Sequence, residues 1–149
     1  MEGVSIQNLT RRRTASRAVF SKIAKEILPD WEISLVFIGS EKALELNKKL
    51  RGKNYVPNVL SYVVGKKSGE IIICLSEARK QAPDFLLSVS SFLLMLFIHA
   101  VLHIKGRVHG ATMDKCEQKL LKRYEATNSH RNRHRHVPGK NGRRRGALR

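Results

Sequence analysis

The chain has 149 residues, of which 42% are hydrophobic, enough for one domain with a core and too few for two comfortable ones. It carries 29 Lys and Arg against 12 Asp and Glu, and this net charge of +17 favours polyanionic partners such as nucleic acid or anionic membrane. The two cysteines lack CxxC spacing, which disfavours a disulfide scaffold, and the first twenty residues contain no apolar signal region.

The chain alternates between segments with the apolar spacing of strands and segments with that of helices. Strands are expected over residues 4–9, 31–38, 59–64 and 70–74. Helices are expected over residues 14–28, 41–50, 76–82, 85–104 and 112–126. A polar loop, 51–58, contains Gly52 and Pro57, which break a helix. The last two strands can pair as a hairpin across the turn at 65–69.

Residues 85–104 contain no Asp, Glu, Lys or Arg, and twenty such residues are long enough to span a bilayer. Three serines and two histidines interrupt the segment, and the buried central helix of a small α/β domain has the same composition. We therefore expect a core helix and no membrane partner. A membrane-embedded protein is the alternative, and recovery in the soluble fraction without detergent would dismiss it.

The composition changes abruptly after Ala126. Residues 128–149 carry eight Lys and Arg, no acid and few apolar residues, so they cannot bury enough surface to fold alone. We expect one folded domain over 1–127 and a disordered basic tail over 128–149. The tail is expected either to bind RNA or only to add solubility.

The most informative segment is 97–115, where three histidines have the spacing His-x3-His-x5-His. His99 and His103 are four residues apart and share a face of the expected helix. Gly106 can end that helix in the left-handed conformation, which lets the chain return His109 to the same ion. Three imidazoles with a fourth position open to water form the ligand set of a catalytic zinc site, so one Zn²⁺ is predicted here. A pair of histidines at this spacing can also be satisfied core groups, but the third favours metal.

The residue after His99 is Ala100, where HExxH peptidases carry their glutamate base, so proteolysis of that type is disfavoured. Without a carboxylate base, metal-activated water would be the nucleophile, and such a hydroxide suits a phosphodiester. Arg51 is the candidate for binding the phosphate, and Arg51 and His99 are the residues expected to carry catalysis. An exposed arginine that balances a helix dipole is the alternative role for Arg51.

The segment HAVLHIKGRVH resembles the histidine signature of the YbeY family of bacterial endoribonucleases that mature ribosomal RNA. The segment LNKKLRGKNYVPNVLSY (46–62) is similar to the family pattern LNxxYRxKDxPTDVLSF, and GEIIIC (69–74) is similar to GDIxIC. The resemblance is strong over about 46–117 and weak over the N-terminal strand, helix and strand. It does not extend to the basic tail.

The resemblance implies an α/β (α+β) fold, with a small mixed sheet of about four strands flanked by helices and a metal site on the central helix. It implies zinc bound by His99, His103 and His109, with Arg51 as the functional arginine of the YRxK motif. It also implies a cytoplasmic, single-strand-specific metallo-endoribonuclease in ribosomal RNA processing (16S rRNA 3′ end maturation) and ribosome quality control. The expected partners are single-stranded RNA and the ribosome or its small subunit.

The chain departs from the family pattern near the ligands. Val108 replaces an aspartate that can orient a metal ligand, and Asp114 or Glu117 could substitute for it. Pro57 replaces the family's threonine. Because the three histidines and Arg51 are kept, we expect an active site rather than a degenerate one.

A non-catalytic RNA- or ribosome-binding protein stabilised by zinc is the competing interpretation. The basic tail favours it, and the absence of a fourth protein ligand in the motif opposes it. Deleting residues 128–149 would separate the two: for an enzyme, RNA affinity should fall while cleavage of a short substrate persists.

Overall fold

The computed structural model describes residues 3–14, 17–106 and 110–133. The strands are β1 (Gly3–Asn8), β2 (Glu32–Ile38), β3 (Val59–Gly65) and β4 (Ser68–Cys74). The helices are α1 (Arg17–Ile27), α2 (Ser40–Arg51), α3 (Leu75–Gln81), α4 (Val89–Ile104) and α5 (Ala111–Arg133), with a 3-10 turn η1 (Ala82–Phe85) before α4. Every predicted strand and helix is present in the predicted order.

The sheet is mixed and has the strand order β1-β2-β4-β3. β2 lies between β1 and β4 and is parallel to both, whereas β3 and β4 form the predicted antiparallel hairpin. Helix α1 connects β1 to β2, as a crossover between parallel strands requires. The predicted fold class, an α+β domain with a four-stranded mixed sheet flanked by helices, is confirmed.

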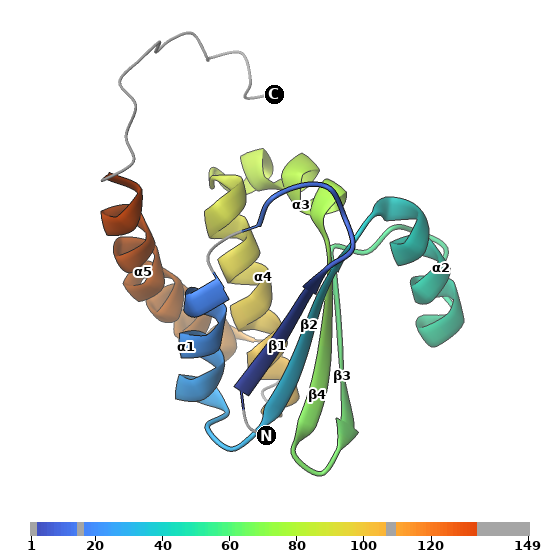
Figure 1. Ribbon diagram of the computed structural model, residues 1–149, viewed down its shortest axis with the longest axis horizontal. Helices are drawn as coiled ribbons and strands as arrows, with labels where there is room; N and C mark the ends of the chain where they lie inside the picture. The colour runs from blue at the N-terminus through green and yellow to red at the C-terminus, as the bar shows by residue number, and fades with distance from the viewer. Residues whose placement is uncertain (1–2, 15–16, 107–109, 134–149) are drawn as a thin grey trace, which may run out of the picture.

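The main core lies between one face of the sheet and helices α1, α4 and α5, while α2 lies on the other side of the sheet (Figure 1). The ring of Phe20 in α1 is 5.8 Å from that of Phe37 in β2 and 5.0 Å from that of Phe97 in α4, measured between centroids. These three aromatic side chains join two helices to the sheet. A second, smaller core lies against α2 and consists of Ile38, Ala43, Leu60, Ile72 and Cys74.

Helix α4 is the central helix, and ten of its sixteen residues are buried. It begins at Val89 instead of residue 85, because Pro83 and the left-handed Leu86 (φ 58°) end the preceding turn. The Ser88 hydroxyl then accepts a hydrogen bond from the Ser91 backbone N–H and caps the helix. The predicted break at Gly106 is confirmed, since Gly106 has a φ of 101° directly after the helix.

Within the described residues, no single helix has both the length and the apolar character needed to cross a membrane. Residues 75–85 and α4 meet that criterion only as a pair, and the pair is bent by 103°.

Helix α5 continues to Arg133, seven residues beyond the predicted end at 126. Residues 134–149 lie outside the described part of the chain. The division into a domain and a basic tail therefore stays a prediction.

Candidate active site

A cavity of about 600 Å³ opens between the C-terminal half of α4, the edge strand β3 and the end of α2. It brings together three of the predicted site residues, Arg51 from α2 and His99 and His103 from α4. Their side chains come from elements that are separated by about fifty residues of chain. The remaining residues that line it are Leu50, Asn58, Val59, Leu60, Ser61, Tyr62, Val63, Ala100 and Ile104.

His99 and His103 lie on the polar edge of a helix that is otherwise buried at this end. Their neighbours Ala100, Val101 and Leu102 are buried, whereas both histidines are partly exposed. The two ring centroids are 4.8 Å apart and the ring planes are inclined by 76°. The pair therefore has the adjacency that binding of a shared ion by two imidazoles requires.

A carboxylate from α5 contacts the first of these histidines. Glu117 Oε2 lies 2.8 Å from His99 Nδ1, and only 10% of the Glu117 side chain is exposed. With Nδ1 engaged by a carboxylate, any coordination of a metal by His99 would use Nε2. A carboxylate on the other ring nitrogen is the usual partner of a metal-binding histidine, where it fixes the ring orientation. Of the two acids expected to substitute at Val108, Glu117 is the one that contacts a predicted ligand.

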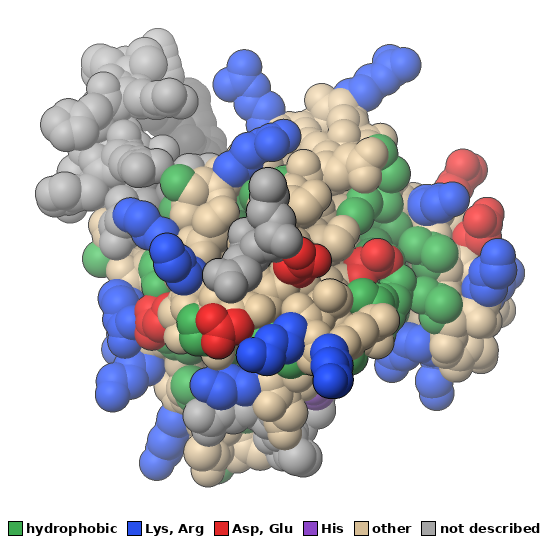
Figure 2. Space-filling model, turned by 60° about the horizontal axis from the view of Figure 1, so that its bottom comes forward, with side chains coloured by type: hydrophobic (Ala, Val, Ile, Leu, Met, Phe, Trp, Pro, Cys, Tyr) green, Lys and Arg blue, Asp and Glu red, His purple; other side chains and the backbone are tan. Residues whose placement is uncertain are grey.

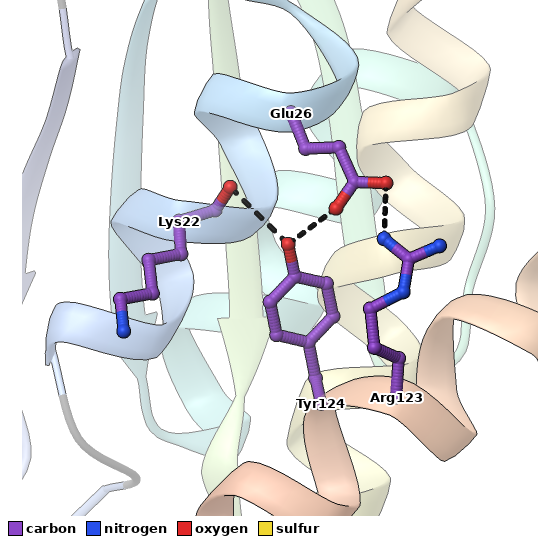
Figure 3. Close-up of polar contacts among 4 residues, drawn as sticks. All are labelled: Lys22, Glu26, Arg123 and Tyr124. Carbon is purple, nitrogen blue, oxygen red and sulfur yellow. Dashed lines mark hydrogen bonds and ion pairs between the residues drawn. The ribbon is translucent and has the colours of Figure 1, made fainter.

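Glu117 is held in place because α5 is packed against the core between Met113 and Tyr124. Its buried side also contains Met113, Leu120, Leu121 and Tyr124. The Tyr124 hydroxyl donates a hydrogen bond to Glu26 Oε1 at 2.5 Å, and Arg123 Nη1 donates to Glu26 Oε2 at 2.6 Å (Figure 3). The Tyr124 oxygen also lies 3.5 Å from the Lys22 carbonyl oxygen. This junction attaches α5 to α1 on the side of the core away from the sheet.

The third predicted ligand, His109, lies outside the described residues. Among the side chains that the structure does describe, no group of three or more His, Cys, Asp or Glu is arranged to hold a metal ion. The complete ligand set thus stays a prediction, and the structure supplies the geometry of two of its members.

The position of Arg51 is determined by the end of α2. Gly52 ends the helix in the left-handed conformation (φ 66°), and its N–H donates to the Lys48 carbonyl oxygen at 3.0 Å. Asn47, which is fully buried, donates from Nδ2 to the Tyr55 carbonyl oxygen at 2.9 Å. These contacts anchor the loop after α2, so Arg51 is presented at the rim of the cavity on a fixed backbone.

Tyr62 on β3 is one of the residues that line this cavity. Its hydroxyl donates to Glu70 Oε1 on the paired strand β4. Burial, the hydrogen bond to Glu70 and the negative charge of Glu70 together raise the pKa of Tyr62 to about 12. Tyr62 is therefore protonated throughout the physiological range.

Asn47 and Gln81 are two of the polar residues near the site that sequence reasoning did not identify. Asn47 follows Ala43 at helical spacing, and these two are the buried positions of α2. That spacing could have predicted from the sequence that Asn47 is buried. Gln81 accepts a hydrogen bond from Asn58 Nδ2 at 2.9 Å. Only the folded chain brings α3 beside this loop, so no local pattern could have identified Gln81.

The fold has a solved counterpart of about the same size. The solution structure of TM1509 from Thermotoga maritima superposes with a TM-score of 0.66 and covers 93% of this chain and 99% of its own, at 20% sequence identity. At that identity the likeness shows the fold alone. The class of protein is thus a small α+β domain in which a helical histidine pair and an arginine share one cavity.

The sequence identifies the family within that class. The family model for Endoribonuclease YbeY matches residues 3–129. Proteins named Endoribonuclease YbeY include those of Spiroplasma citri (31% identity over 119 residues, 70% of this chain and 74% of that protein) and Phytoplasma australiense (28% over 135 residues, 80% and 94%). The protein from Thermodesulfovibrio yellowstonii is 31% identical over 152 aligned positions, covering 79% and 96%. The chain belongs to the YbeY endoribonuclease family, as its motifs predicted.

Proposed function

We propose that the protein is a zinc-dependent endoribonuclease that cleaves single-stranded RNA. Membership of an endoribonuclease family supports the reaction class. We further propose that it acts in the cytoplasm on ribosomal RNA, in 16S rRNA 3′ end maturation and ribosome quality control, with the ribosome or its small subunit as partner. The observation that carries the proposal is the cavity in which Arg51 lies with His99 and His103.

The described donors fit a zinc ion. Neutral imidazole is a common zinc ligand, and the two histidines lie one helical turn apart with adjacent rings. The carboxylate of Glu117 on Nδ1 would keep the His99 ring oriented and raise its basicity. His103 and, from the sequence motif, His109 would complete the set. A zinc ion held there supplies Lewis acidity that activates water and polarises the phosphate.

The residues of the chain itself would bind and orient the substrate. The guanidinium of Arg51 is suited to pair with two phosphate oxygens and to stabilise the negative charge that develops during cleavage. Ser61 and Tyr62 of the edge strand belong to the same lining. The cavity is open on the side of the edge strand β3, where no further strand of the described sheet covers it, and a flexible single strand can enter there more readily than a duplex.

The decisive experiment measures metal content and RNase activity on one purified sample. Wild-type protein should contain about one zinc per chain and should cleave single-stranded RNA but not duplex RNA. His103→Ala should lose both zinc and cleavage, while His130→Ala, which changes a histidine outside the motif, should keep both. Unchanged zinc content and cleavage in His103→Ala would refute the proposal.

A non-catalytic RNA- or ribosome-binding protein stabilised by zinc is the second candidate. The observation in its favour is the charge of +17, which by itself supports RNA binding without cleavage. This candidate predicts that zinc-loaded wild type binds single-stranded RNA and leaves it intact.

A further inference from the structure

A second cavity, of about 440 Å³, lies next to the first and shares Arg51, Asn58 and Val59 with it. The rest of its lining comes from the loop after α2 and from α3: Tyr55, Val56, Pro57, Glu77, Lys80 and Gln81. Building on the proposed function, we propose that this second cavity binds the nucleotide adjacent to the phosphate held at Arg51, with Tyr55 stacking on its base.

Tyr55 has the exposure and the support that a stacking platform needs. Tyr55 is one of the residues that line the cavity and is 52% exposed, although it is a large aromatic residue. The backbone of Tyr55 is held in place, because Asn47 donates a hydrogen bond to the Tyr55 carbonyl oxygen and Asn47 itself is fully buried. An exposed aromatic ring on a rigid backbone can stack on any base without selecting a sequence.

Three of the side chains in the lining residues are joined by a chain of hydrogen bonds. Asn58 Nδ2 donates to Gln81 Oε1 at 2.9 Å, and Gln81 Nε2 donates to Glu77 Oε1 at 3.0 Å. This chain ties α3 to the loop that carries Tyr55. Each amide and the carboxylate has hydrogen-bonding capacity beyond these two bonds, and the polar edge of a base can use it.

The cations that line the two cavities suggest the path of the backbone. On the face drawn in Figure 2, Lys and Arg side chains are spread out rather than gathered in one patch, so charge on this face selects no single route for RNA. Arg51 lies at the boundary of the two cavities, and Lys80 lies in the second. Glu77 would repel a phosphate beside it, so phosphate contacts fall to Arg51 and Lys80 while the base occupies the part lined by Tyr55 and the amides.

The test combines a protein variant with a matching change in the RNA. A labelled single-stranded octamer is prepared intact and with an abasic unit at each position in turn. Binding to the full chain is followed by fluorescence anisotropy without added metal, and cleavage is followed with zinc. Tyr55→Ala should weaken binding of intact RNA by roughly 5- to 100-fold, the range that loss of one stacked base produces. Tyr55→Phe should bind as wild type does, and so should Lys22→Ala, which removes an exposed cation on α1.

The key outcome is that the losses of affinity caused by Tyr55→Ala and by the abasic unit are not additive. An abasic unit at one position, next to the cleaved bond, should weaken binding of the RNA to wild type. The same RNA should bind Tyr55→Ala with nearly the same affinity as intact RNA does. If Tyr55→Ala binds intact RNA as wild type does, or loses the same factor on every abasic RNA as on intact RNA, the assignment is wrong. Because anisotropy needs no turnover, a wild type that binds with this pattern but does not cleave would refute the nuclease and leave the nucleotide site standing.

Discussion

The ring of His99 is oriented by the 2.8 Å hydrogen bond between its Nδ1 and Glu117 Oε2. The sequence motif places an acid directly before the third histidine in the family pattern, and this chain has Val108 there. The acid that contacts a predicted ligand comes instead from the next helix, where burial limits its movement. The acid missing at Val108 therefore has a candidate replacement in Glu117, nine residues further along the chain.

Removing that acid should weaken metal binding without unfolding the protein. Glu117→Ala is expected to lower zinc affinity by about 10- to 100-fold, because the His99 ring loses the partner that fixes its orientation. Zinc affinity is measured by competition with a chelator of known affinity. Asp114→Ala, which changes an exposed acid one turn earlier on α5, is the matched control and should bind zinc as wild type does. Equal affinities of the two variants would contradict the role of Glu117.

Arg51 should act on the chemical step rather than on the metal. Arg51→Lys keeps the charge but loses the planar two-point contact with phosphate, and a fall in kcat of about 10²-fold is expected, the scale seen when one charge-stabilising donor is lost. Zinc content should be unchanged. Single-turnover cleavage with saturating enzyme separates the chemical step from RNA binding. If kcat is retained and only RNA affinity falls, Arg51 is a surface cation and not part of the reaction.

At the level of secondary structure, local signals predicted the elements well but not the contacts between them. Apolar spacing and Gly and Pro positions located every strand and helix, because each element has an apolar side that must be buried. The sheet order, which inserts β4 between β2 and β3, depends on packing between distant segments. The same holds for Asn47, whose partner is the carbonyl oxygen of Tyr55 in the following loop. Hydrogen bonds of this kind join residues at no regular spacing, so no repeating pattern in the sequence predicts them.

The end of α2 should be sensitive to the conformation of Gly52. Its φ of 66° suits glycine and, less well, asparagine, and there is open space where a Cβ would lie. Gly52→Ala should therefore destabilise the protein by about 1–2 kcal/mol from backbone strain alone, and Gly52→Asn by less. Urea denaturation measures both free energies of unfolding. If Gly52→Ala and Gly52→Asn have the stability of wild type, the left-handed helix end is not the feature that positions Arg51.

The junction of α1 and α5 should make stability depend on alkaline pH. Burial, the hydrogen bond to Glu26 and the charge of Glu26 raise the pKa of Tyr124 to about 12, against the influence of Arg123. Because the folded pKa lies above the ordinary value of 10.0, the stabilisation is complete below pH 10 and is lost as the pH rises through about 12. Tyr124→Phe should be less stable than wild type by about 1–2 kcal/mol at neutral pH.

The difference between wild type and Tyr124→Phe should shrink between pH 10 and 12. Urea denaturation at a series of pH values measures it. Tyr62 also has a raised pKa, but it is present in both proteins and its effect cancels. A stability difference that stays constant up to pH 12 would show that the Tyr124 hydroxyl contributes nothing through Glu26.

At the scale of the whole molecule, the positive charge is a property of the body as well as of the C-terminal residues. Lys and Arg side chains lie all around the surface drawn in Figure 2. Composition alone therefore predicted a polyanionic partner but not where it binds. The sequence motifs named Arg51 and the histidines, and the structure adds that the end of α2 and the polar edge of α4 line one cavity.

Truncation after Arg133 keeps the whole of α5 and removes six Lys and Arg. RNA affinity should fall, and the slope of log affinity against log salt should decrease by up to about 4, since each phosphate contact contributes about 0.7 for a single strand. Cleavage of a short RNA that fits the two cavities should continue at the wild-type kcat. Titrations at several salt concentrations, with lysine-rich and neutral replacement tails of equal length as controls, measure the slope. An unchanged slope would mean that these residues do not contact RNA.

Helix α4 both fills the core and carries two of the predicted metal ligands, and this limits which substitutions the helix can accept. Ten of its residues fill the core, while His99 and His103 lie between them along the same backbone. Phe97, which packs on Phe20, is two residues from His99, so any repacking there also moves an imidazole. In a saturation mutagenesis screen scored by RNA cleavage, nearly every position of the last two turns of α4 should therefore be intolerant. A parallel screen scored by soluble expression should give the same profile at the buried positions and differ at His99 and His103, which are partly exposed.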